Sequence, residues 1–133
     1  MELERTLVII KPDGVERGLV GAIINRFEQR GLRIAGMKLM QVTDSLARRH
    51  YAVHEGKPFL DDRVEFMVSG PVVPMVLEKE NAVSDLRTLV GATNPAQADC
   101  GSVRNEIGLD IQRNSVHASD SVENAKVEIG HFF

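Results

Sequence analysis

The sequence predicts an α+β fold in which helices cover a four-stranded antiparallel sheet, the ferredoxin-like split βαβ arrangement. Four short runs of aliphatic and β-branched residues are typical of strands, and between them apolar residues recur with the spacing of amphipathic helices. In chain order the segments are strand, helix, strand, two helices, strand, helix, a long loop before the fourth strand, and a last helix. This order, with four strands divided over two halves, matches the split βαβ plan.

The first half begins with a strand over residues 6–10, whose unbroken aliphatic run predicts burial on both faces of the sheet. Lys11-Pro12-Asp13-Gly14 is expected to end this strand in a turn, because proline removes a ladder donor and Asp-Gly favours a turn. Apolar residues at helical spacing then predict a helix over 19–29 that ends at Gly31, and a second strand follows over 32–42.

The middle of the chain alternates helices with one further strand. Gly56-Lys57-Pro58 interrupts the first helical stretch, and Pro74 within the third strand predicts a bulge or an unpaired position. The expected elements are a helix capped by Thr43-Asp44-Ser45, a helix over 59–68, a strand over 72–77 and a helix over 81–90.

Residues 92–112 carry little regular signal and are expected to form a loop, and a loop of about 20 residues inside a compact domain is usually functional. A short fourth strand around Val116 comes next. Asp120 or Ser121 is expected to cap a last helix over 121–129. Its inward face is expected to carry Val122, Ala125 and Ile129.

Composition narrows the function classes. The chain has 133 residues, 43% of them hydrophobic, and we expect residues 1–133 to form a single domain. A net charge of −3 gives no reason to expect nucleic acid as a main partner, and no run of residues is long and apolar enough for a membrane span or a signal peptide. Cys100 is the single cysteine, which suits a reducing compartment. We therefore expect a cytoplasmic protein.

The candidate chemistry centres on His117, which ends a strand-like run just before the last helix. A histidine there lies near the positive end of a helix dipole, which favours phosphate, and imidazole can act as a covalent nucleophile. Taken alone, this segment favours the simpler interpretation of a surface histidine at a strand-to-helix turn. Basic residues able to bind an anion are Lys11, Arg87, Arg104 and Arg113, with Thr93 and Asn114 as neutral hydrogen-bonding groups.

Three other side chains have both a functional and a structural interpretation. Phe59 could stack on a base, Tyr51 could donate its hydroxyl to the histidine or a phosphate, and Glu128 could hold the second nitrogen of the imidazole. Core packing for the two aromatic residues and solvent exposure for the carboxylate are the ordinary alternatives. His50 and His54 lie four residues apart and could share a metal, but no third ligand is apparent and we expect a solvated pair.

The usual phosphate-binding signatures, G-x-x-x-x-G-K-[ST] and G-x-G-x-x-G, are absent from the chain. Several motifs instead resemble those of the nucleoside diphosphate kinase family, in register from Arg5 to the end of the chain. The most specific is Asn114-x-x-His117-x-Ser119-Asp120-Ser121. The others are Lys11-Pro12-Asp13, Ser69-Gly70-Pro71-Val72-Val73 and Gly91-Ala92-Thr93-Asn94-Pro95.

The resemblance implies transfer of the γ-phosphate of a nucleoside triphosphate to a nucleoside diphosphate through phospho-His117, by a ping-pong mechanism that maintains the NTP and dNTP pools. It implies that Nδ1 attacks and that Glu128 orients the ring, with Mg²⁺ carried mainly by the nucleotide phosphates near Asp120. The remaining positions matching the family are Lys11, Arg87, Thr93 and Arg104 for phosphate, Tyr51 and Ser119 beside the histidine, Asn114 for sugar and phosphate, and Phe59 and Ile111 on the two faces of the base.

The resemblance also implies a homo-oligomer, a tetramer or hexamer built from dimers, and we expect the chain to be of the short bacterial or archaeal type. The sequence departs from the family at Ala118, usually glycine, at Asn105-Glu106-Ile107, and at Cys100, often proline. If position 118 needs a positive φ, alanine there is strained by about 1 kcal/mol. A catalytically weakened relative that serves as a nucleotide-binding or interaction module is the alternative hypothesis.

Overall fold

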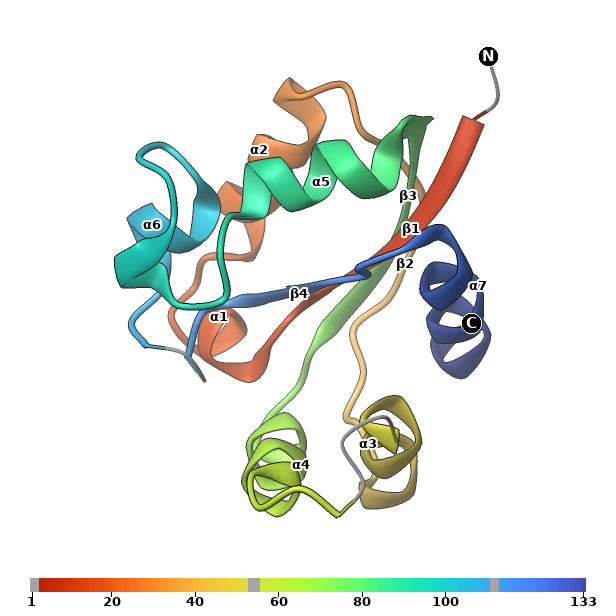
Figure 1. Ribbon diagram of the computed structural model, residues 1–133, viewed down its shortest axis with the longest axis vertical. Coiled ribbons are helices and arrows are strands. Elements are labelled where there is room, and N and C mark those ends of the chain that lie inside the picture. Colours follow the sequence, from red (N-terminus) through yellow and green to blue (C-terminus); the bar gives the residue numbers. More distant parts are fainter. Residues whose placement is uncertain (1–2, 53–55, 111–112) are drawn as a thin grey trace.

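The fold was analysed in a computed structural model that describes residues 3–52, 56–110 and 113–133. Its four strands form one antiparallel sheet with the spatial order β2-β3-β1-β4, as the sequence predicts (Figure 1). The strands are β1 (Leu3–Ile10), β2 (Arg33–Met37), β3 (Val73–Glu80) and β4 (Val116–Ala118).

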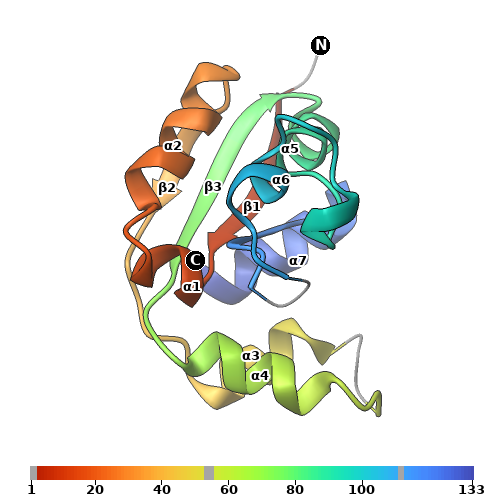
Figure 2. The same ribbon diagram turned by 90° about the vertical axis from the view of Figure 1, so that its left-hand side faces the viewer.

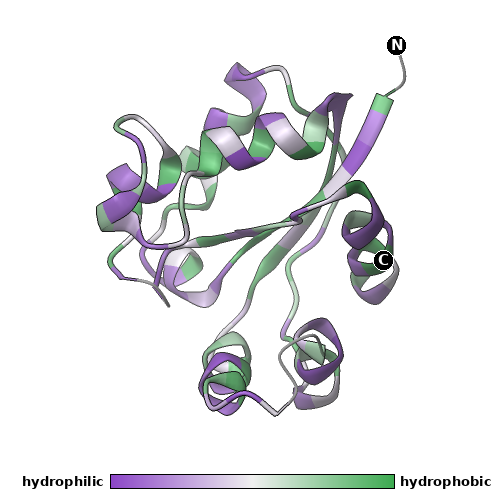
Figure 3. Ribbon diagram, in the orientation of Figure 1, coloured by the Kyte–Doolittle hydropathy of each residue, from purple (hydrophilic) through white to green (hydrophobic). Residues whose placement is uncertain are grey.

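Helices cover the two faces of the sheet, and the central strand β1 is buried on both (Figures 1 and 2). Val8 and Ile10 pack into one core with helices on the first face, whereas Leu7 and Ile9 pack into a second core with helices on the other. The first face carries α2 (Val20–Gln29) and α5 (Ala82–Val90), and the second carries α3 (Asp44–His50), α4 (Leu60–Val68) and α7 (Val122–Phe132). Figure 3 shows α5 with alternating hydrophobic and hydrophilic bands, the pattern of an amphipathic helix.

The register between β1 and β4 decides which way the histidine of β4 points. His117 lies directly opposite Ile9, between the pairs Val8–Ala118 and Ile10–Val116. Because directly opposed residues in an antiparallel pair share a face, the His117 side chain lies on the face covered by α3 and α7.

Two segments expected to be irregular form short helices. Residues 12–16 form α1 (Pro12–Glu16) rather than a simple turn, because Lys11 is extended and proline starts the helix, where its missing N–H has no partner to lose. The long segment before β4 contains a 3-10 turn at Pro95–Gln97 and the helix α6 (Val103–Ile107), whose N-cap Ser102 accepts a hydrogen bond from the Asn105 N–H.

The last helix is longer than the sequence predicts. Ser121 caps it by accepting a hydrogen bond from the Asn124 N–H, and the helix runs on through Phe132, which is buried. Ala125 faces inward as expected. The prediction for Val122 was wrong: its first-turn position leaves it 39% exposed.

Two details of the sheet also differ from expectation. Pro74 lies in regular register opposite Ile9, and the irregularity lies instead in β2, between Ile34 and Gly36. Strand β2 is short, and beyond it the pairing continues through a hydrogen bond from the Lys38 N–H to the Pro74 carbonyl and the isolated bridge from Met40 to Val72. In the part of the chain that the structure describes, no helix is both long and apolar enough to cross a membrane.

Candidate functional site

His117 is held by a carboxylate on the helix that follows it. Its Nε2 is in hydrogen-bond contact with Oε1 of Glu128 in α7, so Nδ1 is the ring nitrogen left for chemistry. The His117 side chain is 25% exposed and that of Glu128 is 12% exposed. The sequence suggested this pairing, and the structure brings the two residues together.

The site keeps the imidazole uncharged. Burial lowers the pKa of His117, and the nearby cations Lys11 and Arg104 lower it further. Burial also raises the pKa of Glu128, and a hydrogen bond from Ser119 opposes that rise. At neutral pH the neutral ring therefore donates its Nε2 proton to the carboxylate and keeps a free electron pair on Nδ1.

Lys11 lies at the end of β1, where it reaches across the site to the segment before β4. Its Nζ donates to Oδ1 of Asn114 at 2.9 Å, and Nδ2 of Asn114 donates to the Thr93 carbonyl at 3.0 Å. Burial beside Arg104 lowers the pKa of Lys11 to about 8. These residues, separated in sequence, form one connected set of phosphate-binding candidates.

Arg104 is locked in place by two backbone carbonyls. It is 8% exposed, and its guanidinium donates to Gly91 at 3.0 Å and to Val116 at 2.7 Å. Its buried Nε has no hydrogen-bond partner within the described chain. Arg87 is exposed and lies 3.5 Å from the Ala118 carbonyl, so its guanidinium remains available to a ligand.

A tight junction between α1 and the segment before β4 aligns Lys11 with Asn114. The Lys11 N–H donates to the Ser115 carbonyl at 2.8 Å, and the Ser115 hydroxyl donates to Asp13 at 3.1 Å. Ser115 has a φ of 75°, which is strained for a serine. A Cβ on Gly14 would lie 3.1 Å from the Ser115 carbonyl oxygen, so glycine permits the close approach. Sequence reasoning missed Asp13 and Ser115 as supports, although Asp13 lies in a recognised motif.

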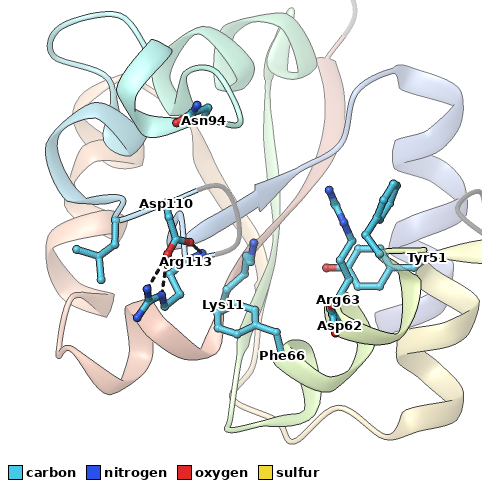
Figure 4. A pocket seen from close by; sticks show the side chains of 10 residues that line it. Lys11, Tyr51, Asp62, Arg63, Phe66, Asn94, Asp110 and Arg113 are labelled. Atoms are coloured by element: carbon cyan, nitrogen blue, oxygen red, sulfur yellow. Dashed lines mark hydrogen bonds and ion pairs between the residues drawn. The ribbon is translucent and has the colours of Figure 1, made fainter. Parts of the chain in front are cut away.

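Two adjoining cavities form a cleft beside these groups. One, of about 580 Å³, contains His117, and the other, of about 730 Å³, contains Phe59. Both are lined by Lys11, Tyr51 and Arg63, and Figure 4 shows these three side chains projecting toward the cavity that contains Phe59. A ligand that spans the two cavities therefore passes Lys11.

The Phe59 cavity contains Arg63, Phe66 and Asp110, which the sequence did not single out, and Arg113, which it did. Arg63 lies over the Phe59 ring, 4.5 Å from its centroid, and Phe66 lines the same cavity. Arg113 pairs with Asp110 at 2.7 Å on the opposite wall (Figure 4). Ile111, expected on the other face of a base, lies outside the described residues.

His50 was wrongly assigned to a solvated pair. It is buried, with its ring centroid 4.5 Å from that of His117 and 4.8 Å from that of Tyr51. Its Nδ1 lies 4.0 Å from Glu128 Oε1. Burial of the ring is the main reason that the His50 pKa is lowered to about 3. His54, its predicted companion, lies outside the described residues.

Ala118 does not have the strained backbone considered from the sequence. Among described residues other than glycine, only Asn81 and Ser115 have a positive φ, so Ala118 needs no glycine-like conformation. Its pairing opposite Val8 places its methyl group in the core on the face opposite His117. Cys100 is exposed.

Asp120 offers one carboxylate for a divalent cation. It is exposed at the rim of the His117 cavity and accepts a hydrogen bond from Asn124 Nδ2 at 2.5 Å. A single carboxylate is a typical protein contribution to Mg²⁺ when substrate phosphates supply the other ligands. The donor set therefore fits a hard cation brought mainly by a phosphate-bearing ligand.

Comparisons with known proteins agree over almost the whole chain. A family model described as nucleoside diphosphate kinase matches residues 4–133. The chain is 56% identical over 131 residues to a nucleoside diphosphate kinase of Roseiflexus sp., covering 98% of this chain and 88% of the relative. It is 55% identical over 133 residues to one of Anaeromyxobacter dehalogenans, covering 100% of this chain and 90% of the relative.

Solved structures show the same similarity. The Aquifex aeolicus nucleoside diphosphate kinase has a TM-score of 0.96 and 43% identity, with 99% of this chain and 96% of that chain covered. The enzyme of Halobacterium salinarum, solved in complex with CDP, has a TM-score of 0.96 and 45% identity, with 99% of this chain and 88% of that chain covered.

Proposed function

This chain belongs to the nucleoside diphosphate kinase family, and we propose that His117 is the residue through which it transfers the γ-phosphate of a nucleoside triphosphate to a nucleoside diphosphate. The observation that carries this assignment is the His117 ring, held at Nε2 by Glu128, in a cavity lined by Lys11, Arg87 and Arg104. Such an enzyme maintains the NTP and dNTP pools by moving phosphoryl groups between nucleotides.

In the first half-reaction, the Nδ1 electron pair of His117 forms a bond to the γ-phosphorus. The bond from that phosphorus to the bridging oxygen breaks, and the nucleoside diphosphate leaves with the electron pair. Positive charge develops on the imidazole as this happens, and the Glu128 carboxylate stabilises it through the Nε2 proton. A second nucleoside diphosphate then takes the phosphoryl group by the reverse path, which gives ping-pong kinetics.

Donors around the ring are suited to hold the phosphate in line for attack. Lys11, Arg87 and Arg104 supply positive charge, and Asn114 is positioned by its bonds to Lys11 and to Thr93. Buried Tyr51, whose pKa burial raises to about 12, remains a neutral hydroxyl beside the cavity.

The base is proposed to lie against Phe59 in the adjoining cavity. Stacking does not distinguish bases, because every base has a π-face, which supports acceptance of several nucleotides. Arg63, which lies over the Phe59 ring, would have to move aside for a base to stack there. Ile111 stays a prediction for the opposite face of the base.

A kinase of this family needs a divalent cation, and we propose Mg²⁺ near Asp120. When bound with the nucleotide, Mg²⁺ neutralises charge on the phosphates during transfer. Asp120 would contribute its carboxylate at the cavity rim, and the phosphate oxygens of the nucleotide would supply further ligands.

We also propose that the chain forms a homo-oligomer built from dimers. Strand β2 is at an edge of the sheet and is followed by exposed Leu39, while Met37 on the strand is 50% exposed. Exposed Phe133 lies 3.6 Å from the position of a Cβ on Gly36 of this strand. An unpaired edge with an apolar border favours association with another chain. Light scattering of the wild type and of Leu39→Asp tests this assignment, and an unchanged mass would contradict it.

Two expectations from the sequence stay predictions. The single domain over residues 1–133 is compatible with a family match that covers residues 4–133. The cytoplasmic location rests on the lone cysteine and the sequence composition.

The assignment of His117 is tested by mixing the protein with Mg-ATP without an acceptor and measuring its intact mass. We expect an acid-labile, base-stable phosphoprotein that GDP discharges with formation of GTP. His117→Ala should abolish the phosphorylated mass, and His131→Ala, the same change at another histidine of the cavity, should keep it. No phosphoprotein from the wild type, or one that persists in His117→Ala, would refute the assignment.

A further inference from the structure

Behind the nucleophile, the structure brings three metal-ligating side chains together. His50, His117 and Glu128 each place one ligand atom within 4.8 Å of the other two. Among the described residues, these three form the group of histidine, cysteine and acidic side chains that could hold a metal ion. They come from α3, β4 and α7, so the cluster exists only in the folded chain. Two histidines and one glutamate form a ligand set that suits Zn²⁺.

His50 is the member that phosphoryl transfer leaves without a task. Its side chain is 2% exposed, and its Nδ1 has no hydrogen-bond partner in the described chain. That nitrogen lies 4.0 Å from Glu128 Oε1, which also contacts His117 Nε2. His50 Nδ1 is therefore a buried polar atom without a hydrogen bond, because the carboxylate oxygen that it faces already contacts His117.

Each histidine offers one ring nitrogen to the cluster. Nδ1 of His50 has no hydrogen-bond partner in the described chain, and Nε2 of His117 contacts Glu128. All three side chains line the cavity of about 580 Å³, which gives an ion a path from the cleft. Imidazole nitrogen favours Zn²⁺ over Mg²⁺, which prefers oxygen, so the cluster differs in kind from the carboxylate of Asp120.

From this arrangement we propose that His50, His117 and Glu128 form an inhibitory site for Zn²⁺. The ion would bind His50 Nδ1, His117 Nε2 and a Glu128 oxygen in place of the present hydrogen bond between His117 and Glu128. His131 lies one helical turn beyond Glu128 in α7 and lines the same cavity.

Binding at Nε2 would remove the nucleophile. The proton that Nε2 gives up moves to Nδ1, so the ring stays neutral but no longer has an electron pair facing the γ-phosphorus. The Glu128 carboxylate becomes a metal ligand and no longer stabilises charge on the ring. Inhibition rests on the proposed role of His117, whereas binding of Zn²⁺ does not.

Binding is tested by titrating the metal-free Cys100→Ser protein with Zn²⁺ in a calorimeter, because the exposed thiol is a competing ligand. We expect one Zn²⁺ per chain, and at least about tenfold weaker binding in both His50→Phe and His50→Gln. Phenylalanine keeps a ring in the pocket and glutamine keeps polarity, and thermal unfolding shows that each variant is folded. Asp120→Asn is the control and should bind Zn²⁺ as the parent does. Equal affinity in the folded His50 variants, or no binding by the parent, would overturn the site.

Inhibition is tested by adding Zn²⁺ before Mg-ATP and measuring phosphoprotein by intact mass. We expect less phosphoprotein as the Zn²⁺ concentration rises, and recovery when the Zn²⁺ is removed. Because ATP also chelates Zn²⁺, the inhibitory concentration is expressed as Zn²⁺ not bound to ATP, and it should not shift when more ATP is added. Normal phosphorylation of a Zn²⁺-loaded protein would overturn the inhibitory role and leave the function of His117 intact. Absence of phosphoprotein even without Zn²⁺ would instead refute the proposed function, and the titration would still decide the metal site.

Discussion

Replacing Glu128 by glutamine removes one charge from the contact that holds His117. Glutamine can still accept a hydrogen bond from Nε2, so the ring keeps its orientation. A hydrogen bond to a charged group contributes about 1.5–3 kcal/mol and a neutral one about 0.5–1.5 kcal/mol. The Glu128 side chain is 12% exposed, so water screens little of the difference. A loss of about 1–1.5 kcal/mol in stabilisation of the charge on the ring corresponds to about tenfold slower phosphorylation.

The assay is a single-turnover measurement of phosphoprotein formation from Mg-ATP by rapid quench. Glu123→Gln is the matched control, because Glu123 is exposed in the first turn of the same helix and should phosphorylate at the wild-type rate. The pH dependence gives a second readout. Burial raises the pKa of Glu128, so the wild-type rate should fall as the pH drops through that pKa, and Glu128→Gln should lack this fall. A wild-type rate in Glu128→Gln, or an unchanged acid limb, would refute the role of the carboxylate.

Three further changes test other parts of the structure. Gly14→Ala would place a methyl group 2.9 Å from Ile10 Cγ2 and should lower the free energy of unfolding, measured in urea, by about 1–3 kcal/mol; an unchanged midpoint would contradict the close packing. Affinity for ADP, measured by calorimetry, should weaken as the pH rises through about 8, where Lys11 loses its proton, and Lys11→Arg should remove that dependence; a wild-type affinity independent of pH would exclude Lys11 as the group responsible. The pKa of His50 falls from 6.5 in the unfolded chain to about 3 in the folded protein. Between these two pH values the unfolded chain therefore binds a proton at His50 that the folded protein does not bind. Stability is therefore full above about pH 6.5 and should decrease toward pH 3, and a melting temperature that stays constant over this range would contradict the burial of His50.

Local patterns were sufficient for the order of the four strands and the longer helices. The aliphatic run of β1 and the amphipathic spacing of α2 and α5 are each contained in a short stretch, and all three formed where the sequence predicts them. The errors lie where local signals compete. Pro12 reads as the end of a strand, yet proline also suits the first turn of a helix, and α1 formed there.

The site shows the same division. Lys11, Glu128 and His117 could be identified as candidates because each lies in a recognisable motif or at the edge of an apolar pattern. His50 could not, since its burial depends on helices that pack from distant parts of the chain. Ser115 was missed because no local signal marks a serine that takes a positive φ and whose carbonyl lies close to Gly14.

The sequence by itself determined the chemical groups, the elements that carry them and the family resemblance, because these depend on neighbours along the chain. Only the tertiary structure decided how the groups face one another. The pairing of Ile9 with His117 turns the imidazole toward α7, and the docking of α3 and α7 on that face brings His50 and Glu128 to it. Contacts such as that between Lys11 and Asn114, 103 positions apart, form only when the sheet register and the helix packing are satisfied together.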